Sequence, residues 1–349
     1  MKIESVLFLA LSILMLGCTV MESTSFPEEA HSKDINVIER IRINGAELHC
    51  SIKGENTENP LLLVLHGGPG DTSLPLVSRY NKELEKYYTV VVLEQRGAGK
   101  SYYPFSENEE LGIADFVEDT YQLTLYLLER FSKEKLTVTA HSWGSVIGMR
   151  FILEHPEVVT AYVGCGQVID MRQTTAASYQ FALDRNTEQG NERVVARLEE
   201  IDCSYQGDDW LDDLLFVTRE VVRNGGSLYT KTSYNTFIWQ FLVSREYSFA
   251  DLIRRQKGSI QSIRQLWPEL MTVTFEGVDS FEVPVIFIEG RHDFHASSAI
   301  VERFYNNIRS EKQLLWFEES AHFPQWTECD KYNQIVINLL SHDNSQSET

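Results

Sequence analysis

Cysteine and basic residues are scarce in this chain of 349 residues, and each shortage excludes a class of protein. The five cysteines form no Cys-x-x-Cys pair and show no cysteine–histidine spacing typical of a metal site. We therefore expect neither a disulfide scaffold nor a bound metal. Lys and Arg total 31 against 51 Asp and Glu, a formal net charge of −20. That balance argues against nucleic acid as a partner, because phosphate binding requires a basic surface.

The apolar run at the N-terminus is too short to span a bilayer. It covers the 11 residues from Val6 to Leu16, whereas a membrane-spanning helix needs about 20, and this length is typical of a signal peptide. Gly17-Cys18 follows directly and resembles a bacterial lipobox, in which the cysteine is acylated and becomes the new N-terminus. We expect residues 1–18 to be a lipoprotein-type signal peptide, with export and anchoring to the cell-envelope membrane through Cys18. The alternative is an ordinary secretory signal with a chance cysteine.

A polar segment follows, and then the pattern of a globular protein. Residues 19–34 are polar and predict a flexible tether with no fold of its own. Hydrophobic residues make up 43% of the chain, which is enough for a sizeable core. Polar and apolar residues alternate at 40–43 and 47–53, on either side of Asn44-Gly45. This predicts a β-hairpin, because Asn-Gly supplies the positive φ of a tight turn.

Short unbroken apolar runs predict strands that are buried on both faces. Between the second and third runs, apolar residues recur at helical spacing from Phe116 to Phe131. Strands that alternate with helices imply crossover connections and a mostly parallel sheet. The first four runs lie at 61–65, 89–93, 136–140 and 159–163, and the pattern returns at 284–289 and 313–317.

The segment between the apolar runs at 159–163 and 284–289 contains helix-like patterns only. We therefore expect an α/β fold in which a mostly parallel sheet is flanked by helices and carries an inserted helical cap. The expected boundaries are 35–169 for the first part of the core, 170–280 for the cap, 281–342 for the second part of the core and 343–349 for a polar tail.

The third apolar run leads directly into a serine and then into a helical pattern. A strand, a tight turn and a helix with serine at the apex form a nucleophile elbow. So sharp a turn needs small side chains two positions before and after the serine, and Ala140 and Gly144 meet that need around Ser142. The helix N-terminus there favours developing negative charge. We predict Ser142 as a nucleophile; the alternative is a serine that only caps the helix.

A nucleophilic serine needs a base, and the base needs an orienting carboxylate. Both should follow later strands, in the order serine, acid, histidine. Asp293 comes after the strand pattern at 284–289, and His322 comes after the one at 313–317. We predict Asp293 as the acid and His322 as the base. Side chains that could replace them are Asp170 as the acid, and His292 or His295 as the base.

The oxyanion of acyl transfer needs two backbone N–H donors. One is expected from Trp143, directly after the nucleophile. The other is expected from Gly68, because the run His66-Gly67-Gly68-Pro69-Gly70 lets the backbone approach a substrate closely; the alternative is a plain turn. Three further side chains are expected to be structural, namely His66, His141 and Arg96, the last as a buried cation near Glu94 or the sheet edge.

Four motifs follow predicted strands, namely His66-Gly67-Gly68-Pro69-Gly70, Glu94-Gln95-Arg96-Gly97-Ala98-Gly99-Lys100-Ser101, His141-Ser142-Trp143-Gly144-Ser145 and Gly290-Arg291-His292-Asp293. Together they resemble the proline iminopeptidase group of α/β-hydrolases, over residues 35–169 and 281–340. The resemblance implies an α/β-hydrolase fold with a helical cap, and a serine hydrolase that often cleaves an N-terminal residue or a small amide or ester. Carried over position by position, it implies Ser142 as nucleophile, Asp293 as acid and His322 as base.

The chain departs from this family at two places. Glu94 stands where the family usually has Asp, and the cap lacks the tryptophan–glutamate pattern that holds the substrate α-amine. A buried ammonium still needs a carboxylate partner. We predict Glu220 and Glu246 for this substrate-binding role, because each sits beside an aromatic or apolar run. The alternative is that both are surface charges paired with Arg219, Arg223 or Arg245.

These features predict a serine hydrolase that works without metal or cofactor. The expected substrate is a small molecule or short peptide, cleaved through an acyl-enzyme as a peptide or aminoacyl amide. The close alternative is a carboxylesterase on small esters, whose pocket above Ser142 would be lined by apolar and aromatic side chains. The alternative from another class is a catalytically dead surface binding module, against which the complete set of Ser142, Asp293 and His322 argues.

Overall fold

The computed structural model describes residues 33–106 and 109–346, and the chain from Lys33 onward forms one compact unit. The predicted signal peptide, Cys18 and nearly all of the predicted tether lie outside the described residues. No helix within the described ranges is long and apolar enough to cross a membrane.

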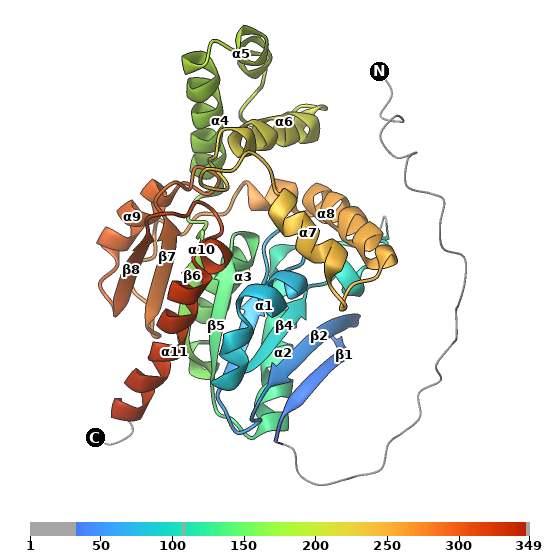
Figure 1. Ribbon diagram of the computed structural model, residues 1–349, viewed down its shortest axis with the longest axis vertical. Coiled ribbons are helices and arrows are strands. Elements are labelled where there is room, and N and C mark those ends of the chain that lie inside the picture. The colour runs from blue at the N-terminus through green and yellow to red at the C-terminus, as the bar shows by residue number, and fades with distance from the viewer. Residues whose placement is uncertain (1–32, 107–108, 347–349) are drawn as a thin grey trace. The chain divides into compact units, whose positions relative to one another are not determined.

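In these ranges eight strands form one sheet and alternate with helices along the chain (Figure 1). The strands are β1 (Ile35–Ile43), β2 (Ala46–Gly54), β3 (Leu61–Leu65), β4 (Thr89–Glu94), β5 (Leu136–His141), β6 (Val159–Cys165), β7 (Val285–Gly290) and β8 (Lys312–Phe317). The α-helices are α1 (Leu74–Tyr80), α2 (Ile113–Phe131), α3 (Trp143–Glu154), α4 (Met171–Glu188), α5 (Glu192–Glu199), α6 (Trp210–Arg223), α7 (Asn235–Val243), α8 (Phe249–Leu270), α9 (Ser298–Asn307), α10 (Pro324–Thr327) and α11 (Cys329–Gln346). Short 3₁₀ helices are η1 (Lys82–Lys86), η2 (Gly99–Ser101) and η3 (Pro156–Val158).

The sheet is mostly parallel, as the alternation of strands and helices predicted. Its strand order is β1-β2-β4-β3-β5-β6-β7-β8. The pairs β1–β2 and β2–β4 are antiparallel, and all the later pairs are parallel. The β1–β2 hairpin turns at Asn44 and Gly45, and both have the positive φ that the sequence predicted.

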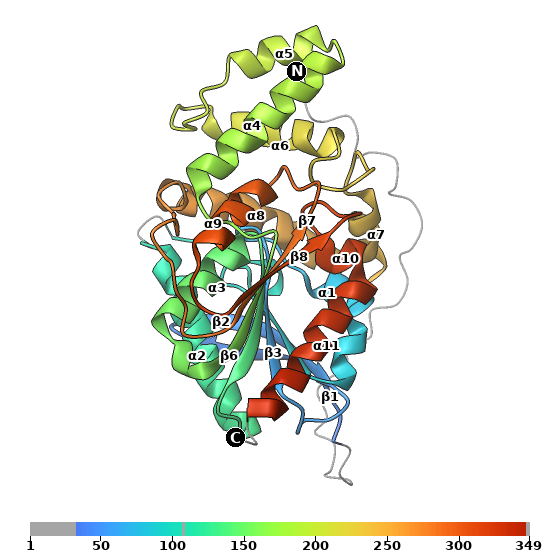
Figure 2. The same ribbon diagram turned by 90° about the vertical axis from the view of Figure 1, so that its left-hand side faces the viewer.

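Alternate side chains of the central strands enter two different apolar clusters. In β3, Leu61, Leu63 and Leu65 belong to the cluster that also contains residues of α2, α3 and α9, whereas Leu62 belongs to the cluster that contains residues of α1 and α11. Figure 2 shows the sheet nearly edge-on between these two layers of helices. A strand that is covered on both faces needs an apolar residue at every position. This explains why the central strands appear in the sequence as unbroken apolar runs.

The carboxyl ends of the parallel strands meet at one edge of the sheet, where α/β folds place their sites. There β3 leads to Gly68, β5 to Ser142, β7 to Asp293 and β8 to His322. In the strand order, β3 lies next to β5, and β7 lies next to β8, with β6 between the two pairs. The topology therefore gathers residues that are far apart in the sequence.

The cap, α4–α8, is inserted between β6 and β7 and covers that edge (Figure 1). Within residues 170–280, all of which the structure describes, the β pairing consists of one isolated bridge between Asp170 and Thr274. Leu266 and Trp267 of α8 join the larger apolar cluster of the core. Cap and core thus share one interior.

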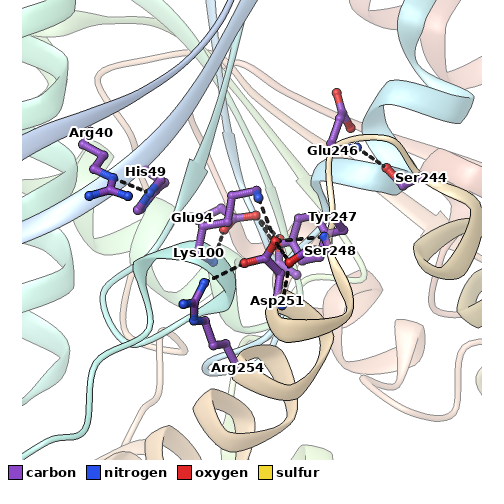
Figure 3. A network of polar contacts seen from close by, with 11 residues as sticks. Arg40, His49, Glu94, Lys100, Ser244, Glu246, Tyr247, Ser248, Asp251 and Arg254 are labelled. Carbon is purple, nitrogen blue, oxygen red and sulfur yellow. Dashed lines mark hydrogen bonds and ion pairs between the residues drawn. The ribbon is translucent and has the colours of Figure 1, made fainter. Parts of the chain in front are cut away.

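Buried polar contacts also fasten the cap to the core (Figure 3). Glu94, at the end of β4, accepts hydrogen bonds from the hydroxyl groups of Tyr247 and, at 2.8 Å, Thr72. Burial raises the pKa of Glu94, although these donors oppose the shift. Nearby, Nζ of Lys100 lies 2.9 Å from Oδ2 of Asp251 on α8. The first turn of α8 is therefore held against the loop after β4.

Arg96 is the buried structural cation that the sequence predicted, but its partner is Asp119 of α2 and not Glu94. Nε of Arg96 lies 2.8 Å from Oδ2 of Asp119, and Nη2 lies 2.6 Å from Oδ1. Glu94 is engaged by the cap instead. Loss of one partner from so buried a pair leaves an uncompensated charge, which costs about 3–5 kcal/mol.

Candidate active site

Ser142 sits at a sharp turn between β5 and α3. Its backbone has φ +53° and ψ −122°. Residues other than glycine rarely adopt this combination, which stores strain. Gly144 makes the turn possible, because a Cβ at this position would stand 2.4 Å from the carbonyl oxygen of Leu65. The close contact between α3 and β3 leaves the Ser142 side chain beyond the end of β5, in the wall of a cavity.

The three residues predicted as nucleophile, base and acid form one hydrogen-bonded chain. Oγ of Ser142 lies 2.9 Å from Nε2 of His322, and Nδ1 of His322 lies 2.8 Å from Oδ2 of Asp293. A carboxylate can only accept, so Nδ1 carries the ring proton. Nε2 of the neutral ring is then free to accept the proton of the Ser142 hydroxyl.

The Asp293 carboxylate is buried but stabilised in its charged form. Its second oxygen, Oδ1, accepts the backbone N–H groups of His295 at 2.8 Å and Ala296 at 2.9 Å. Burial opposes ionisation, but the facing His322 and the backbone donors outweigh it and hold the pKa of Asp293 below its ordinary value. Asp293 is therefore negative at neutral pH and suited to stabilise an imidazolium.

The rival candidates occupy other positions. Asp170 caps the N-terminus of α4 by accepting a backbone N–H at 2.8 Å. His292 stacks on a tyrosine ring at 3.9 Å. The ring of His295 is 4.5 Å from that of His322, and burial lowers its pKa to about 3, so that it stays neutral beside the base. Neither histidine hydrogen-bonds to Ser142.

His66 and His141 have the structural roles that the sequence predicted. Nε2 of His141 lies 2.8 Å from the carbonyl oxygen of His322, and because a carbonyl only accepts, His141 donates. His66 donates from Nδ1 to the carbonyl oxygen of Gly67 at 2.7 Å. Burial lowers the pKa of both rings, to about 4 for His66, so both are neutral. His141 thereby supports the loop that carries the base.

Gln95 links the two halves of the predicted oxyanion hole, and the sequence analysis missed it. Its Nε2 donates to the carbonyl oxygen of His66 at 2.9 Å, and its Oε1 accepts the indole N–H of Trp143 at 2.7 Å. Within the described residues, the backbone N–H groups of Gly68 and Trp143 have no acceptor, so both are available to a substrate oxygen. Gln95 stands in one of the quoted motifs, but the motif did not indicate this role, because the partners of Gln95 come from two other loops.

A cavity of about 530 Å³ lies over Ser142, between the core loops and the cap. Ser142, His322, Gly68 and Trp143 are part of its wall. This volume is in the range of sites for small molecules. The cap contributes mainly apolar side chains, among them Leu214, Val221, Phe237, Phe241 and Ile263.

A few polar atoms interrupt this apolar wall. Buried polar atoms are nearly always hydrogen-bonded, and a few of the residues that line the cavity carry buried side-chain atoms that are exceptions. Among the described residues, the buried lining atoms that lack a partner include Oγ of Ser73, Oγ1 of Thr174, the hydroxyl group of Tyr205 and Nε1 of Trp326.

Apart from histidines, the charged side chains in the described part of the wall are one ion pair. Asp71 comes from the loop after β3, and Arg255 comes from α8. Nη2 of Arg255 donates to Oδ2 of Asp71 at 2.9 Å, and Nε donates to the other oxygen. The carboxylate that faces the cavity thus belongs to the core and not to the cap.

Glu220 and Glu246 do not line the cavity, so their prediction as substrate-binding residues is wrong. Glu220 is buried on α6, where it pairs with Arg223 at 2.8 Å and Arg219 at 3.5 Å. Glu246 lies on the link between α7 and α8 (Figure 3), and it pairs with Lys53 of β2. Both carboxylates are neutralised by cations outside the cavity wall. A neighbouring apolar run did not reveal which way the carboxylates turn.

Comparison with known proteins supports the same architecture. The family model described as the alpha/beta hydrolase fold matches residues 60–329. A probable aminopeptidase, YbaC of Bacillus subtilis (strain 168), is 31% identical over 312 residues, which are 89% of this chain and 98% of the relative. A proline iminopeptidase of Saccharolobus solfataricus is 21% identical over 303 residues, which are 86% of this chain and 90% of the relative.

Solved structures show the same fold. A proline iminopeptidase-related protein of Thermus thermophilus superposes with a TM-score of 0.62 at 17% identity, and the match covers 88% of this chain and 98% of that one. A proline iminopeptidase of Mycobacterium smegmatis gives 0.60 at 16% identity, over 89% and 100%. The chain is therefore a hydrolase of the α/β-hydrolase fold family, in the branch that resembles proline iminopeptidases.

Proposed function

We propose that this hydrolase acts by acyl transfer through Ser142. The observation that carries the proposal is the continuous chain from Ser142 Oγ through His322 to Asp293, at 2.9 and 2.8 Å. His322 takes the hydroxyl proton as Oγ attacks a carbonyl carbon, and Asp293 holds the ring in the tautomer that can accept it. A binding protein without activity has no need for this arrangement.

The remaining steps use groups around the same cavity. The backbone N–H groups of Trp143 and Gly68 stabilise the oxyanion of the tetrahedral intermediate. His322 then protonates the leaving amine or alcohol, and an ester forms on Ser142. A water molecule, deprotonated by His322, attacks that ester, and the acid product leaves as Ser142 regains its proton.

We propose an aminoacyl amide or short peptide as the substrate, cleaved at its N-terminal residue. The relatives named aminopeptidase and proline iminopeptidase support this class. The free α-ammonium of such a substrate needs a carboxylate. Asp71 is the carboxylate in the described cavity wall, so it takes the role first assigned to Glu220 and Glu246. To bind the ammonium, Asp71 shares its oxygens with Arg255.

Hydrolysis of small carboxylic esters is the second candidate, and a specific observation favours it. No cap carboxylate faces the cavity in the described residues, and the cap side of the wall is largely apolar. An ester with an uncharged acyl group places no ammonium there and buries its chain against those side chains. The two candidates share every step at Ser142 and differ only in what the cavity recognises.

The assignment of the acid can be tested with two matched substitutions. Asp293→Asn reverses the polarity of the contact with Nδ1 and stabilises the wrong tautomer, so we expect kcat to fall about 10³- to 10⁴-fold. Asp170→Asn keeps a good helix cap and is expected to retain full activity. The measurement is kcat on one substrate, with circular dichroism of both variants. Equal losses in the two variants contradict the assignment.

Substitution of Asp71 distinguishes the aminopeptidase proposal from the esterase proposal. We expect Asp71→Asn to lower kcat/KM for leucine p-nitroanilide about 10- to 100-fold, because a hydrogen bond to a charged group contributes about 1.5–3 kcal/mol. Hydrolysis of p-nitrophenyl butyrate should change little. The N-acetylated anilide, which has no ammonium, serves as a control and should be a poor substrate of both proteins. An equal loss on anilide and ester, or preference for the acetylated anilide, rejects the aminopeptidase proposal. Hydrolysis of the ester without hydrolysis of the anilide favours the esterase.

We further propose that Cys18 is acylated and holds the mature chain at the cell-envelope membrane. The support is the apolar run Val6–Leu16 followed by Gly17-Cys18. Cys18→Ser should abolish incorporation of a radiolabelled fatty acid and leave the chain unprocessed, as seen from its mass. A wild-type chain that is cut elsewhere in the leader and carries no lipid refutes the proposal.

A further inference from the structure

Large apolar side chains gather on the outer surface of α7 and the first turns of α8. Trp239 is 59% exposed, Leu242 57% and Phe249 74%. Of the 14 large hydrophobic side chains exposed in the described residues, six fall between positions 238 and 253. Scattered exposed residues of this kind are ordinary, but a cluster marks an interaction site. The six, here called the cap face, are Ile238, Trp239, Leu242, Val243, Phe249 and Ile253.

The cap face does not arise from a loosely packed helix. In α7, Phe237 and Phe241 are buried and pack toward the core, on the opposite side from Trp239 and Leu242. Arg255 of α8 lies 4.3 Å from the centre of the Phe241 ring, so α8 contacts the buried side of α7 at this point. Helix α7 is thus apolar on both sides, although only one side is covered by the described chain. A helix that is apolar all round is normally buried.

The link between the two helices is held firmly. Ser248 caps α8, and its side chain and that of Asp251 exchange hydrogen bonds with each other's backbone N–H groups. Asp251 is bound by Lys100, and the adjacent Tyr247 is bound by Glu94 of the core (Figure 3). Phe249 follows directly in the chain. Its exposure is therefore fixed by buried polar contacts on both sides of it and is not a consequence of a free loop.

Cations outnumber carboxylates in the segment that carries the cap face, although the whole chain has a net charge of −20. Between the end of α6 and the end of α8, residues 224–270 contain six Lys and Arg against three Asp and Glu, a local net charge of +3. The three carboxylates pair with cations of the core, Glu246 with Lys53, Asp251 with Lys100 and Glu269 with Arg150. Two of the six cations are also ion-paired, Arg254 with Asp251 and Arg255 with Asp71. Among the described residues, no carboxylate forms an ion pair with three exposed cations of this segment, namely Lys231, Arg245 and Lys257.

The cap face is continuous with the cavity over Ser142. Ile238 belongs to both, because it lines the cavity and is 47% exposed. The buried neighbours on the same helix, Phe237 and Phe241, line the cavity as well. A surface that covers the cap face would therefore lie beside an apolar route toward the nucleophile.

We propose that the cap face docks onto an anionic lipid bilayer. Exposed aromatic and aliphatic side chains flanked by uncompensated cations are the combination by which helices lie in a bilayer surface, with the apolar groups inserted and the cations on lipid phosphates. A second copy of this chain suits the face less well, because a two-fold contact would bring the cations of both copies together. The contact is separate from any lipid on Cys18 and does not depend on which bond Ser142 cleaves.

Trp239 supplies a direct measurement. The other tryptophans, at 143, 210, 267, 316 and 326, are buried or half-buried, so quenching by brominated lipid reports mainly Trp239. The protein is the full chain with Cys18→Ser, which carries no acyl group at that position, and the vesicles contain brominated phosphatidylglycerol or brominated phosphatidylcholine. We expect quenching on the phosphatidylglycerol vesicles, weaker quenching on phosphatidylcholine, and loss of the difference in high salt.

Substitution on the cap face supplies the matched comparison. Leu242→Ser with Phe249→Ser should lower partition into phosphatidylglycerol vesicles by about tenfold or more, because two large apolar side chains no longer leave water. Leu153→Ser, an exposed leucine on α3 of the core, should have no effect. Neither variant touches the cavity wall, so hydrolysis of a soluble substrate should be unchanged in both.

Three results overturn the proposal. The first is vesicle binding without quenching of Trp239, which places the contact elsewhere in the chain. The second is equal partition of the cap-face variant and the Leu153→Ser control. The third is a concentration-dependent dimer in sedimentation velocity that the cap-face substitutions abolish, which assigns the face to a second copy of the chain. Loss of activity on a soluble substrate would instead bear on the proposed function.

Discussion

The turn at Ser142 is the constraint on which the rest of the site depends. The backbone of Ser142 has φ +53°. This turn brings α3 so close to β3 that position 144 has no room for a Cβ, so it requires glycine. The strain is balanced by burial of β5 and α3 in the core. In return the Ser142 hydroxyl stands above the sheet edge at the start of a helix, where negative charge on a substrate oxygen is favoured.

Buried electrostatics then order the groups around that hydroxyl. Asp293 is the charged member, kept ionised by His322 and by two backbone donors. The nearby rings of His141 and His295 are neutral because burial lowers their pKa. His322 therefore has one charged partner and no competing cation within the described surroundings. The cap covers these groups with mostly apolar side chains. Its outer surface is also apolar at α7 and α8.

Features set by local pattern could be predicted from the sequence, and features set by side-chain partners could not. The strands, the Asn44-Gly45 turn and the chain from Ser142 to Asp293 follow from residue periodicity, turn chemistry and the order of loops along a parallel sheet. Arg96 was recognised as a buried cation, and its partner Asp119 lies on the helix predicted over residues 116–131, but the helical spacing does not show which of its side chains meets Arg96. Side chains whose partners come from distant loops were missed or misassigned for the same reason, among them Gln95, Asp71, Glu220 and Glu246.

Covalent labelling of Ser142 tests the central claim most directly. A fluorophosphonate transfers its phosphonyl group to an activated serine and releases fluoride, so it reports the nucleophile without requiring the natural substrate. The account predicts one adduct per chain in the intact mass, located on Ser142 by peptide mapping and absent when His322 is replaced by alanine. A folded protein that hydrolyses esters or amides while its adduct lies on another residue, or that carries no adduct at all, contradicts the account.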